Sequence, residues 1–236
     1  MKLSQLFANC AWDVIYKQVG DSVNYAFVED NGILYIYFEG SNSITDWVRN
    51  FLFKKKPYKD MDVKYKVHRG FLAAWKTVED IIINKITEQV TVEVYDEEKK
   101  RKKIEKKYKY NKIYVVGYSH GGALAAFCHE CVWFHRPDLR DGGFVGYGFE
   151  APRIYGAWHV KKSLKERWDN FYVIRTNNDI VTHCPPRLFR FTHVGHMIKV
   201  KGNTKLVKEK HLKCIKSHFP RVVYDALLKY EEEKGE

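Results

Sequence analysis

The sequence predicts an α/β protein with a mostly parallel central sheet that helices cover on both faces. Three observations support this fold class. Apolar β-branched runs alternate along the chain with segments whose apolar residues recur at helical spacing. The pair Asn31-Gly32 separates two strand-like segments, and a G-x-S-x-G motif at residues 117–121 joins a strand-like segment to a helix-like one. Strands that alternate with helices favour a parallel sheet, because the helices serve as crossovers between the strands.

Before the motif, each predicted element follows from its apolar pattern. In chain order these elements are an amphipathic helix over residues 1–19, a β-hairpin over 22–30 and 33–40, a short amphipathic helix over 43–52, a strand over 62–68 and a long helix over 70–89. The hairpin is indicated by Asn-Gly, which accepts the positive φ angles of a tight turn. Ser43 and Asp46 stand at capping-box spacing, although aspartate replaces the usual Glu or Gln.

The second half continues the alternation. Its predicted elements are a protruding basic β-hairpin near 90–111, a strand over 112–119, a helix over 121–136, a strand over 143–154, a helix over 157–168, a strand over 171–179, a strand or hairpin arm over 187–200 and a closing helix over 221–234. No repeat with a period of about 20 to 50 residues suggests an array. We therefore expect one domain over residues 1–236, a length that can bury a sizeable core.

The chain is strongly basic. Lysine and arginine number 41 against 29 acidic residues, which gives a formal net charge of +12. Such a charge suits an anionic surface, either phospholipid or nucleic acid. The usual nucleic-acid-binding motifs are missing, so we expect peripheral contact with an anionic membrane and no nucleic acid partner.

Cysteine usage and the first residues bear on location. Five cysteines, an odd number without framework spacing, favour a reducing compartment. The apolar residues near the start are interrupted by polar ones, so no signal-peptide core forms, and no run of about twenty apolar residues could span a bilayer. These observations predict a cytoplasmic protein.

The motif at residues 117–121 indicates a nucleophile elbow. It lies between an apolar strand-like run and an alanine-rich helical run, which is the context that a catalytic G-x-S-x-G requires. A sharp turn there would hold Ser119 in strained geometry, with glycines where side chains would collide. The following helix would direct its N–H groups at the oxyanion formed when a carbonyl is attacked. Ser119 is thus the candidate nucleophile.

An acid and a base should follow the serine in the chain, in that order. Asp179 comes just past a predicted strand and is favoured over Asp138 and Asp141, which lie in a turn that looks solvated. His218 precedes the last helix, on a loop suited to delivering an imidazole. By chemistry alone four histidines remain rivals to it: His183, His193, His196 and His211.

Several segments in the same order resemble the class 3, or fungal-type, lipases of the α/β-hydrolase superfamily. The segments that carry the likeness are "YFEGSNSITDWVRNFLF", "VHRGFLAAW", "VVGYSHGGALAAF", "GFEAPRIYG", "RTNNDIVTHCPP", "FTHVGHMIKV" and "SHFPRVVYDAL". The resemblance implies an α/β-hydrolase fold with Ser119 as nucleophile, Asp179 as acid and His218 as base. It also implies Ser41 and the backbone N–H of His120 as oxyanion donors, with no metal and no organic cofactor.

The resemblance further implies a lid over the site. The segment near 43–53 carries the apolar residues of a lid helix, with a lysine triplet after it, which suits opening at a lipid interface. The candidate lid and substrate residues are Ile44, Trp47, Val48 and Phe51. An ordinary packed helix with a solvated lysine turn remains an equal alternative.

Two functions from different classes therefore stay open. The favoured one is a serine carboxylic ester hydrolase, of lipase, phospholipase or esterase type, acting on lipid esters. The alternative is a noncatalytic lipase-like scaffold that binds a partner or an anionic membrane. Cys128 and Cys131 form a C-x-x-C pair, but they lie two turns into the predicted helix, so we expect buried apolar groups rather than a redox or zinc site.

Overall fold

A seven-stranded sheet forms the centre of the computed structural model, which describes residues 2–21, 23–40, 53–96 and 101–235. The strand order is β1-β2-β3-β8-β9-β10-β11. β1 and β2 pair antiparallel, as do β2 and β3, and the remaining neighbours pair parallel. The strands are β1 Lys17–Val19, β2 Val23–Asp30, β3 Ile33–Phe38, β8 Lys112–Tyr118, β9 Phe144–Phe149, β10 Phe171–Thr176 and β11 His196–Val200. The mostly parallel sheet predicted from the sequence is confirmed.

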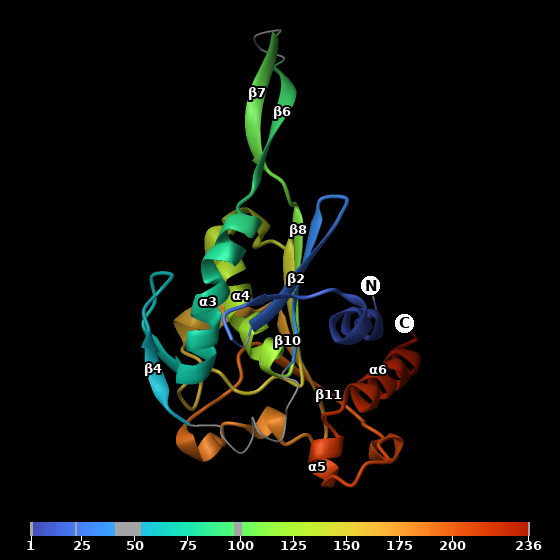
Figure 1. The fold of residues 1–236 in the computed structure, drawn as a ribbon. Helices are drawn as coiled ribbons and strands as arrows, with labels where there is room; N and C mark the ends of the chain where they lie inside the picture. The colour runs from blue at the N-terminus through green and yellow to red at the C-terminus, as the bar shows by residue number, and fades with distance from the viewer. Residues whose placement is uncertain (1, 22, 41–52, 97–100, 236) are drawn as a thin grey trace.

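Helices cover both faces of this sheet (Figure 1). One face carries α3 (Arg69–Ile86) and α4 (His120–His135), which pack against each other, and α4 also packs on β8 and β9. The other face carries α1 (Leu3–Ala8) and α6 (Pro220–Lys234), which also contact each other. The prediction of two covered faces is therefore confirmed.

The alternation of side chains along β3 explains why both faces need cover. Three of its residues, Leu34, Ile36 and Phe38, are buried in the core under α3 and α4. The residues between them, Tyr35 and Tyr37, belong to the second core, under α1 and α6. Because successive side chains of a strand point to opposite faces, an uninterrupted apolar strand supplies two cores at once.

The first hairpin has the predicted turn. Asn31 and Gly32 take φ angles of 46° and 80°, and β2 and β3 pair directly from Asp30 opposite Ile33. Two successive positive φ angles define the tight turn whose twist matches that of the flanking strands.

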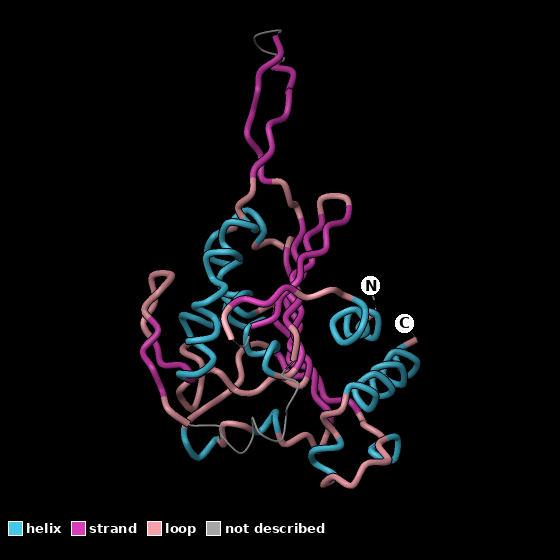
Figure 2. The backbone as a smooth tube through the Cα atoms, viewed as in Figure 1, coloured by secondary structure: helices cyan, strands magenta, loops and turns pink. Residues whose placement is uncertain are grey.

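The basic hairpin is also present, as β6 (Gln89–Asp96) and β7 (Arg101–Tyr108). It projects from one end of the molecule as a separate two-stranded ribbon (Figures 1 and 2). At its base Lys109 contacts Glu29 and Glu88, and Lys85 on α3 contacts the same two carboxylates. These ion pairs tie the ribbon to the body of the protein.

A second small sheet pairs β4 (Lys55–Tyr58) with β5 (Tyr65–His68). The remaining short elements are a π-helical turn η1 Asn9–Asp13, the 3₁₀ helices η2 Pro137–Leu139, η3 Lys162–Trp168, η4 Val181–His183, η5 Arg187–Phe189 and η6 Thr204–Leu206, and the single turn α5 Lys213–Lys216. In the part of the chain that the structure describes, no helix combines the length and apolar character needed to cross a bilayer.

Several predicted elements differ from the observed ones. The helix expected over residues 157–168 is wrong, since only the 3₁₀ helix η3 forms there. Just before this segment, Tyr155 forms isolated β-bridges with Val67 and Thr192. At the end of the segment, the Trp168 indole N–H donates to the Ala126 carbonyl. These tertiary contacts outweigh the helical periodicity.

Other differences concern strand boundaries. The arm expected over 187–200 is a strand only over His196–Val200, and the first predicted helix is shorter than expected, because β1 already occupies Lys17–Val19. β4 corresponds to none of the predicted elements. The predicted lid helix over 43–52, with Ile44, Trp47, Val48 and Phe51, lies outside the described residues, as does Ser41.

Candidate active site

Ser119 occupies a strained turn between β8 and α4. Its φ and ψ are 56° and −121°, a conformation that non-glycine residues rarely adopt. The turn is held by a hydrogen bond from the Ser119 N–H to the Phe149 carbonyl at 2.8 Å and by one from the Gly122 N–H to the Ser119 carbonyl at 2.9 Å. A strained backbone conformation that the surrounding structure holds in place is typical of a functional position.

The hydroxyl of Ser119 meets an imidazole. The Oγ atom lies 2.8 Å from His218 Nε2, and His218 Nδ1 lies 2.6 Å from Asp179 Oδ2. The three side chains are far apart in the sequence, and each residue is almost fully buried, with exposed fractions of 3%, 0% and 0% for Ser119, Asp179 and His218. The structure thus brings the three residues into one hydrogen-bonded chain, the arrangement that activates a serine for attack on a carbonyl.

Parallel pairing explains why these residues meet. β8, β9 and β10 are neighbours, and their registers place Tyr118 opposite Phe149, and Phe149 opposite Ile174. The residues that follow these strands therefore emerge at the same edge of the sheet. In open α/β sheets this carboxyl edge is where ligands bind.

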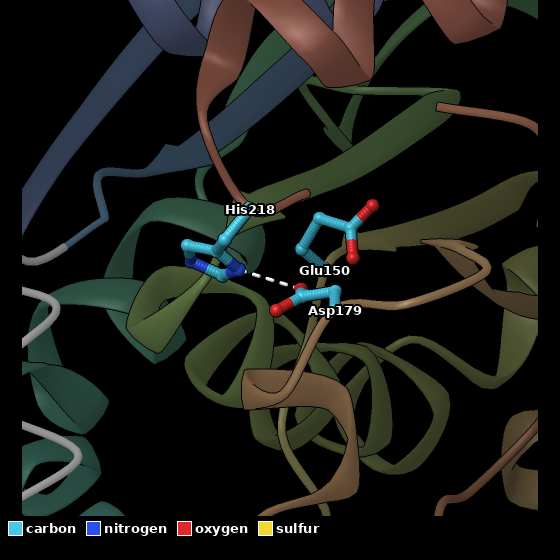
Figure 3. A group of neighbouring side chains, drawn as sticks. All are labelled: Glu150, Asp179 and His218. Carbon is cyan, nitrogen blue, oxygen red and sulfur yellow. Dashed lines mark hydrogen bonds and ion pairs between the residues drawn. The ribbon is translucent and has the colours of Figure 1, made fainter. Parts of the chain in front are cut away.

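The loop after β10 fixes the Asp179 carboxylate. The Val181 N–H donates to Oδ1 at 2.9 Å, which leaves Oδ2 for His218. Burial alone would raise the pKa of Asp179, but His218 beside it and the Val181 N–H hold this pKa below its usual value. The carboxylate is therefore ionised at neutral pH and can orient the imidazole (Figure 3).

His218 is held from both sides in the short segment between α5 and α6. Its backbone N–H donates to the Ile215 carbonyl at 3.0 Å, and its own carbonyl accepts a hydrogen bond from the Tyr118 hydroxyl. The Tyr118 and His218 rings also stack, with centroids 5.2 Å apart. The imidazole is thus positioned by β8 as well as by its own loop.

The N-terminus of α4 lies directly beside the nucleophile, since α4 begins at His120. The free N–H groups and the positive end of the helix favour negative charge at this place. The imidazole of His120 packs 5.6 Å from the Phe71 ring, and burial, with a smaller effect of His68, lowers its pKa to about 4. His120 is therefore uncharged at neutral pH, and its backbone can serve as an oxyanion donor.

The rival acids and bases do not take part in the hydrogen-bonded chain of Ser119, His218 and Asp179. Asp138 pairs with the buried Arg136 at 2.7 Å, and Asp141 is exposed. His193 is turned to the Thr182 carbonyl at 2.9 Å, and burial lowers its pKa to about 3. The other rival histidines have different contacts: the His183 ring bonds to the Asp179 carbonyl, and the rings of His196 and His211 pack on Tyr172 and Phe219.

Glu150, which is not predicted from the sequence, lies beside Asp179 and His218. It follows β9 directly, is fully buried and has a positive φ of 50°. One carboxyl oxygen of Glu150, one of Asp179 and a ring nitrogen of His218 all lie within 4.8 Å of one another. A glutamate at the end of an apolar glycine-rich strand, in "GYGFEAPR", was the signal that could have revealed it.

The cysteines take no part in this site. Cys128 and Cys131 are buried within α4, and burial raises the pKa of both thiols well above the usual value. All five cysteines are free. The pair therefore packs as small apolar groups, as the sequence predicts.

Comparison with known proteins identifies the relatives of this chain. The family model "Lipase (class 3)" matches residues 35–189, a span that includes Ser119 and Asp179 and ends before His218. A lipase of Rhizomucor miehei is 28% identical over 177 residues, which is 72% of this chain and 42% of that protein. The secreted mono- and diacylglycerol lipase A of Penicillium cyclopium is 26% identical over 192 residues, 80% of this chain and 55% of that protein.

The fold has solved counterparts as well. The structure of the Rhizomucor miehei triacylglyceride lipase matches with a TM-score of 0.64 at 22% identity, over 86% of this chain and 79% of that chain. The present chain spans about half the length of the curated relatives that it matches.

The comparison corrects one expectation. The prediction of a cytoplasmic protein is wrong, because the Penicillium relatives are secreted lipases. The physical reason lies in the cysteines on which that prediction relied. Cys10, Cys128, Cys131 and Cys184 are buried, and thiols shielded from solvent resist oxidation in any compartment, so their number says little about location.

The family match covers more than half of the 236 residues, and it coincides with the strands and the strained serine turn described above. The resemblance predicted from seven sequence segments is thereby confirmed. This chain, with its α/β-hydrolase fold, belongs to the class 3 lipase family.

Proposed function

We propose that this chain is a serine carboxylic ester hydrolase that cleaves acyl esters of lipids through an acyl-enzyme intermediate. The observation that carries the proposal is the hydrogen-bonded chain from Ser119 through His218 to Asp179. Membership of the lipase family supports a lipid ester as the substrate class. Triacylglycerols, phospholipids and smaller esters are the members of that class to be separated by experiment.

The geometry assigns a role to each residue. His218 Nε2 takes the Ser119 proton as Oγ attacks the ester carbonyl carbon, and Asp179 holds the imidazole in the tautomer that has its free nitrogen toward the serine. The imidazolium then protonates the leaving alcohol, and the acyl group stays on Oγ. Water, activated by the same imidazole, releases the fatty acid and restores Ser119.

We assign the backbone N–H of His120 and Ser41 as donors to the oxyanion. His120 is the first residue of α4, where the helix leaves N–H groups free beside the nucleophile. Ser41 lies outside the described residues, so its assignment is supported by the family resemblance alone. Each such donor lowers the barrier by about 3 kcal/mol in enzymes where a single donor has been deleted.

We also propose that residues 1–236 act as one domain. Ser119, Asp179 and His218, the proposed catalytic triad, come from three separate parts of the chain. The two buried cores pack on the two faces of the same central sheet. A cut between these parts would separate Ser119 from its base.

An anionic membrane is the surface on which we propose that the protein works. Apolar side chains are exposed near the loops that carry Asp179 and His218: Leu188 at 80%, Leu212 at 71% and Phe189 at 46%. Phe53 stacks on Phe189 at 4.7 Å. Exposed apolar groups beside cations suit insertion among acyl chains with lysine or arginine at the headgroup phosphates. The neighbouring cations are Arg187, Arg190 and Lys213.

The basic hairpin points away from such a membrane. β7 leads directly into the start of β8, whereas Ser119 follows the end of β8, and the seven residues of β8 span about 23 Å at 3.3 Å per residue. β6 and β7 therefore lie at the end of the molecule opposite α5 (Figure 1). We assign the membrane contact to the end that carries η5 and α5.

Vesicle binding tests this assignment. Leu188→Ser should weaken binding to vesicles of phosphatidylcholine with phosphatidylglycerol, and added salt should weaken binding of the parent protein. Ile104→Ser on the hairpin is the matched control, because Ile104 is 72% exposed at the other end. If only the Ile104 variant lost binding, the assignment of the surface would be wrong.

Covalent labelling tests the catalytic proposal. A fluorophosphonate should label the protein, and Ser119→Ala should abolish both the labelling and the hydrolysis of p-nitrophenyl esters graded in chain length. Preference for long chains with micelles would support a lipid substrate, and preference for short soluble esters would contradict it. A folded protein that neither takes the label nor turns over esters would favour the noncatalytic scaffold.

A further inference from the structure

The Glu150 backbone is fixed in an uncommon conformation. Its φ of 50° is in the left-handed region, where glycine is usual, and its N–H donates to the Ile174 carbonyl at 2.7 Å. One carboxyl oxygen, Oε1, accepts from the Thr176 N–H at 2.6 Å. The side chain is therefore held at the ends of β9 and β10 rather than being free to reach solvent.

The Glu150 carboxyl lies beside Asp179 and His218. Glu150 Oε2 is buried and receives no hydrogen bond from any donor that the structure describes. Figure 3 shows the Glu150 carboxyl beside Asp179, with the His218 ring bonded to Asp179. Both Asp179 oxygens already accept hydrogen bonds, from Val181 and His218, and they offer no donor to Glu150.

After burial, the charge of Asp179 has the largest effect on the pKa of Glu150. The other ionisable neighbours that the structure describes are Tyr118 on β8 and His218 before α6, and the Thr176 backbone N–H donates to Oε1. His218 is bonded to Asp179 and not to Glu150. Two buried carboxylates that share a site without an intervening cation cannot both ionise, so one of them keeps a proton.

Building on the hydrolase function proposed above, we propose that Glu150 is a positioning residue that stays protonated and donates its O–H to Asp179, fixing that carboxylate for His218. The proton belongs to Glu150 rather than to Asp179 for a structural reason. Asp179 accepts two hydrogen bonds from donors that favour its charge, whereas Glu150 accepts only one on Oε1.

The directions of the two pKa shifts agree with this assignment. Burial, and then the charge of Asp179, raises the pKa of Glu150 well above its usual value. Burial would raise the pKa of Asp179, but His218 and the Val181 N–H hold it below its usual value. Glu150 touches no reacting atom, so its effect on the reaction passes through Asp179.

Two substitutions of Glu150 test whether its side chain acts as a hydrogen-bond donor or only fills space. Glu150→Gln keeps a neutral side chain whose N–H₂ can donate to Asp179, whereas Glu150→Ala removes the donor. We expect Glu150→Ala to lose about 10- to 100-fold in kcat, with KM little changed, and Glu150→Gln to recover most of that loss. Glu231→Gln is the matched control, because Glu231 is a buried carboxyl that bonds Ser4 on α1.

The pH profile is the second readout. As the pH rises, the activity of the parent protein should fall when Glu150 ionises, and Glu150→Gln should remove this fall because the amide has no proton to lose. Glu231→Gln should keep the profile of the parent protein. The proposal would be overturned if Glu150→Gln, still folded by circular dichroism, were as inactive as Glu150→Ala, or if Glu150→Ala kept full kcat.

An infrared measurement does not depend on turnover. The spectrum of the parent protein at neutral pH, minus that of Glu150→Gln, should contain the C=O stretching band of a protonated carboxylic acid. Absence of this band would overturn the role of Glu150 even in an active enzyme. Presence of the band in a protein without esterase activity would contradict the proposed function alone.

A bound cation is the remaining alternative for the pair. The ligand atoms of Glu150, Asp179 and His218 are close enough to hold a metal ion. Loss of activity on treatment with EDTA and recovery with Zn²⁺ would mean that a cation rather than a proton neutralises the carboxyls, which would overturn the proposal. Full activity in EDTA would support it.

Discussion

Gly117 and Gly121 approach each other so closely that a Cβ atom on Gly117 would lie 2.1 Å from the Gly121 carbonyl oxygen. A Cβ on Gly121 would in turn lie 2.2 Å from the Phe38 carbonyl oxygen. Both obstacles are backbone atoms, which cannot move aside as a flexible side chain can. The two glycines thus allow β3, β8 and α4 to meet at the turn that holds Ser119.

Gly117→Ala should therefore both destabilise the protein and disable the site. We expect a loss of more than about 3 kcal/mol in the free energy of unfolding, because the backbone must shift to admit the methyl group. Gly142→Ala is a suitable comparison: its φ is +86° and no atom lies within 4 Å of the added Cβ, so it should cost only about 1 to 2 kcal/mol of backbone strain. Urea unfolding measures both, and equal losses would contradict the steric account.

Replacement of the proposed acid tests how the imidazole is oriented. In Asp179→Asn the amide N–H₂ would face His218 Nδ1, so the ring would present a protonated Nε2 to Ser119 instead of a lone pair. We expect kcat for a p-nitrophenyl ester to fall by about 10⁴-fold with KM little changed.

Asp138→Asn is the matched control for this substitution. Asp138 pairs with Arg136 at 2.7 Å and lies after α4, away from the triad. It should therefore affect unfolding more than turnover. If the two variants lost equal activity, Asp179 would not be the acid of the triad.

The Tyr118 hydroxyl gives a third test. It donates to the His218 carbonyl, while its ring stacks on the imidazole at 5.2 Å. Tyr118→Phe keeps the ring and removes the donor, so we expect about a tenfold loss in kcat and about 1 kcal/mol in the free energy of unfolding.

Tyr114→Phe serves as the control for Tyr118→Phe. Tyr114 lies on the same face of β8, where it stacks on Tyr35 at 5.0 Å and does not contact His218. It should leave turnover as in the parent protein. A matching loss in both variants would mean that the face of the strand, rather than the hydroxyl of Tyr118, positions the imidazole.

The predictability of this site from sequence differed between its parts. Ser119 could be predicted because the tight turn leaves no room for a side chain at Gly117 and Gly121, so the turn leaves a recognisable glycine pattern in the sequence. The strands of the central sheet could also be predicted, because burial on both faces requires continuous apolar runs such as that of β3.

Residues whose role depends on tertiary approach were harder to find. Glu150 lies far from Asp179 in the sequence, and only the parallel register of β9 with β10 brings their carboxyls together. Residues 157–168 carry a helical pattern, yet the β-bridges of Tyr155 and the hydrogen bond of the Trp168 indole to Ala126 hold this part of the chain in another conformation. Local pattern cannot anticipate such contacts, because the partners come from other elements.

The Glu150 carboxyl also predicts how stability depends on pH. Its pKa in the native protein is raised, by burial first and by Asp179 second, above the 4.5 of an unperturbed glutamate. The native state therefore holds this proton more tightly than the unfolded state, and the stability that comes with it is complete below about pH 4.5 and is lost as the pH rises through the native pKa. The lowered pKa of Asp179 acts in the opposite sense, at acid pH, where stability is lost as the pH falls.

Glu150→Gln should for this reason become more stable relative to the parent protein as the pH rises from about 5 to 9, by at most about 1.4 kcal/mol per pH unit. The measurement is the free energy of unfolding in urea at several pH values for the two proteins. Glu231→Gln, near the far end of α6, corrects for effects common to the loss of a buried carboxyl. A difference between parent and Glu150→Gln that stayed constant over this range would show that Glu150 carries no proton specific to the native state.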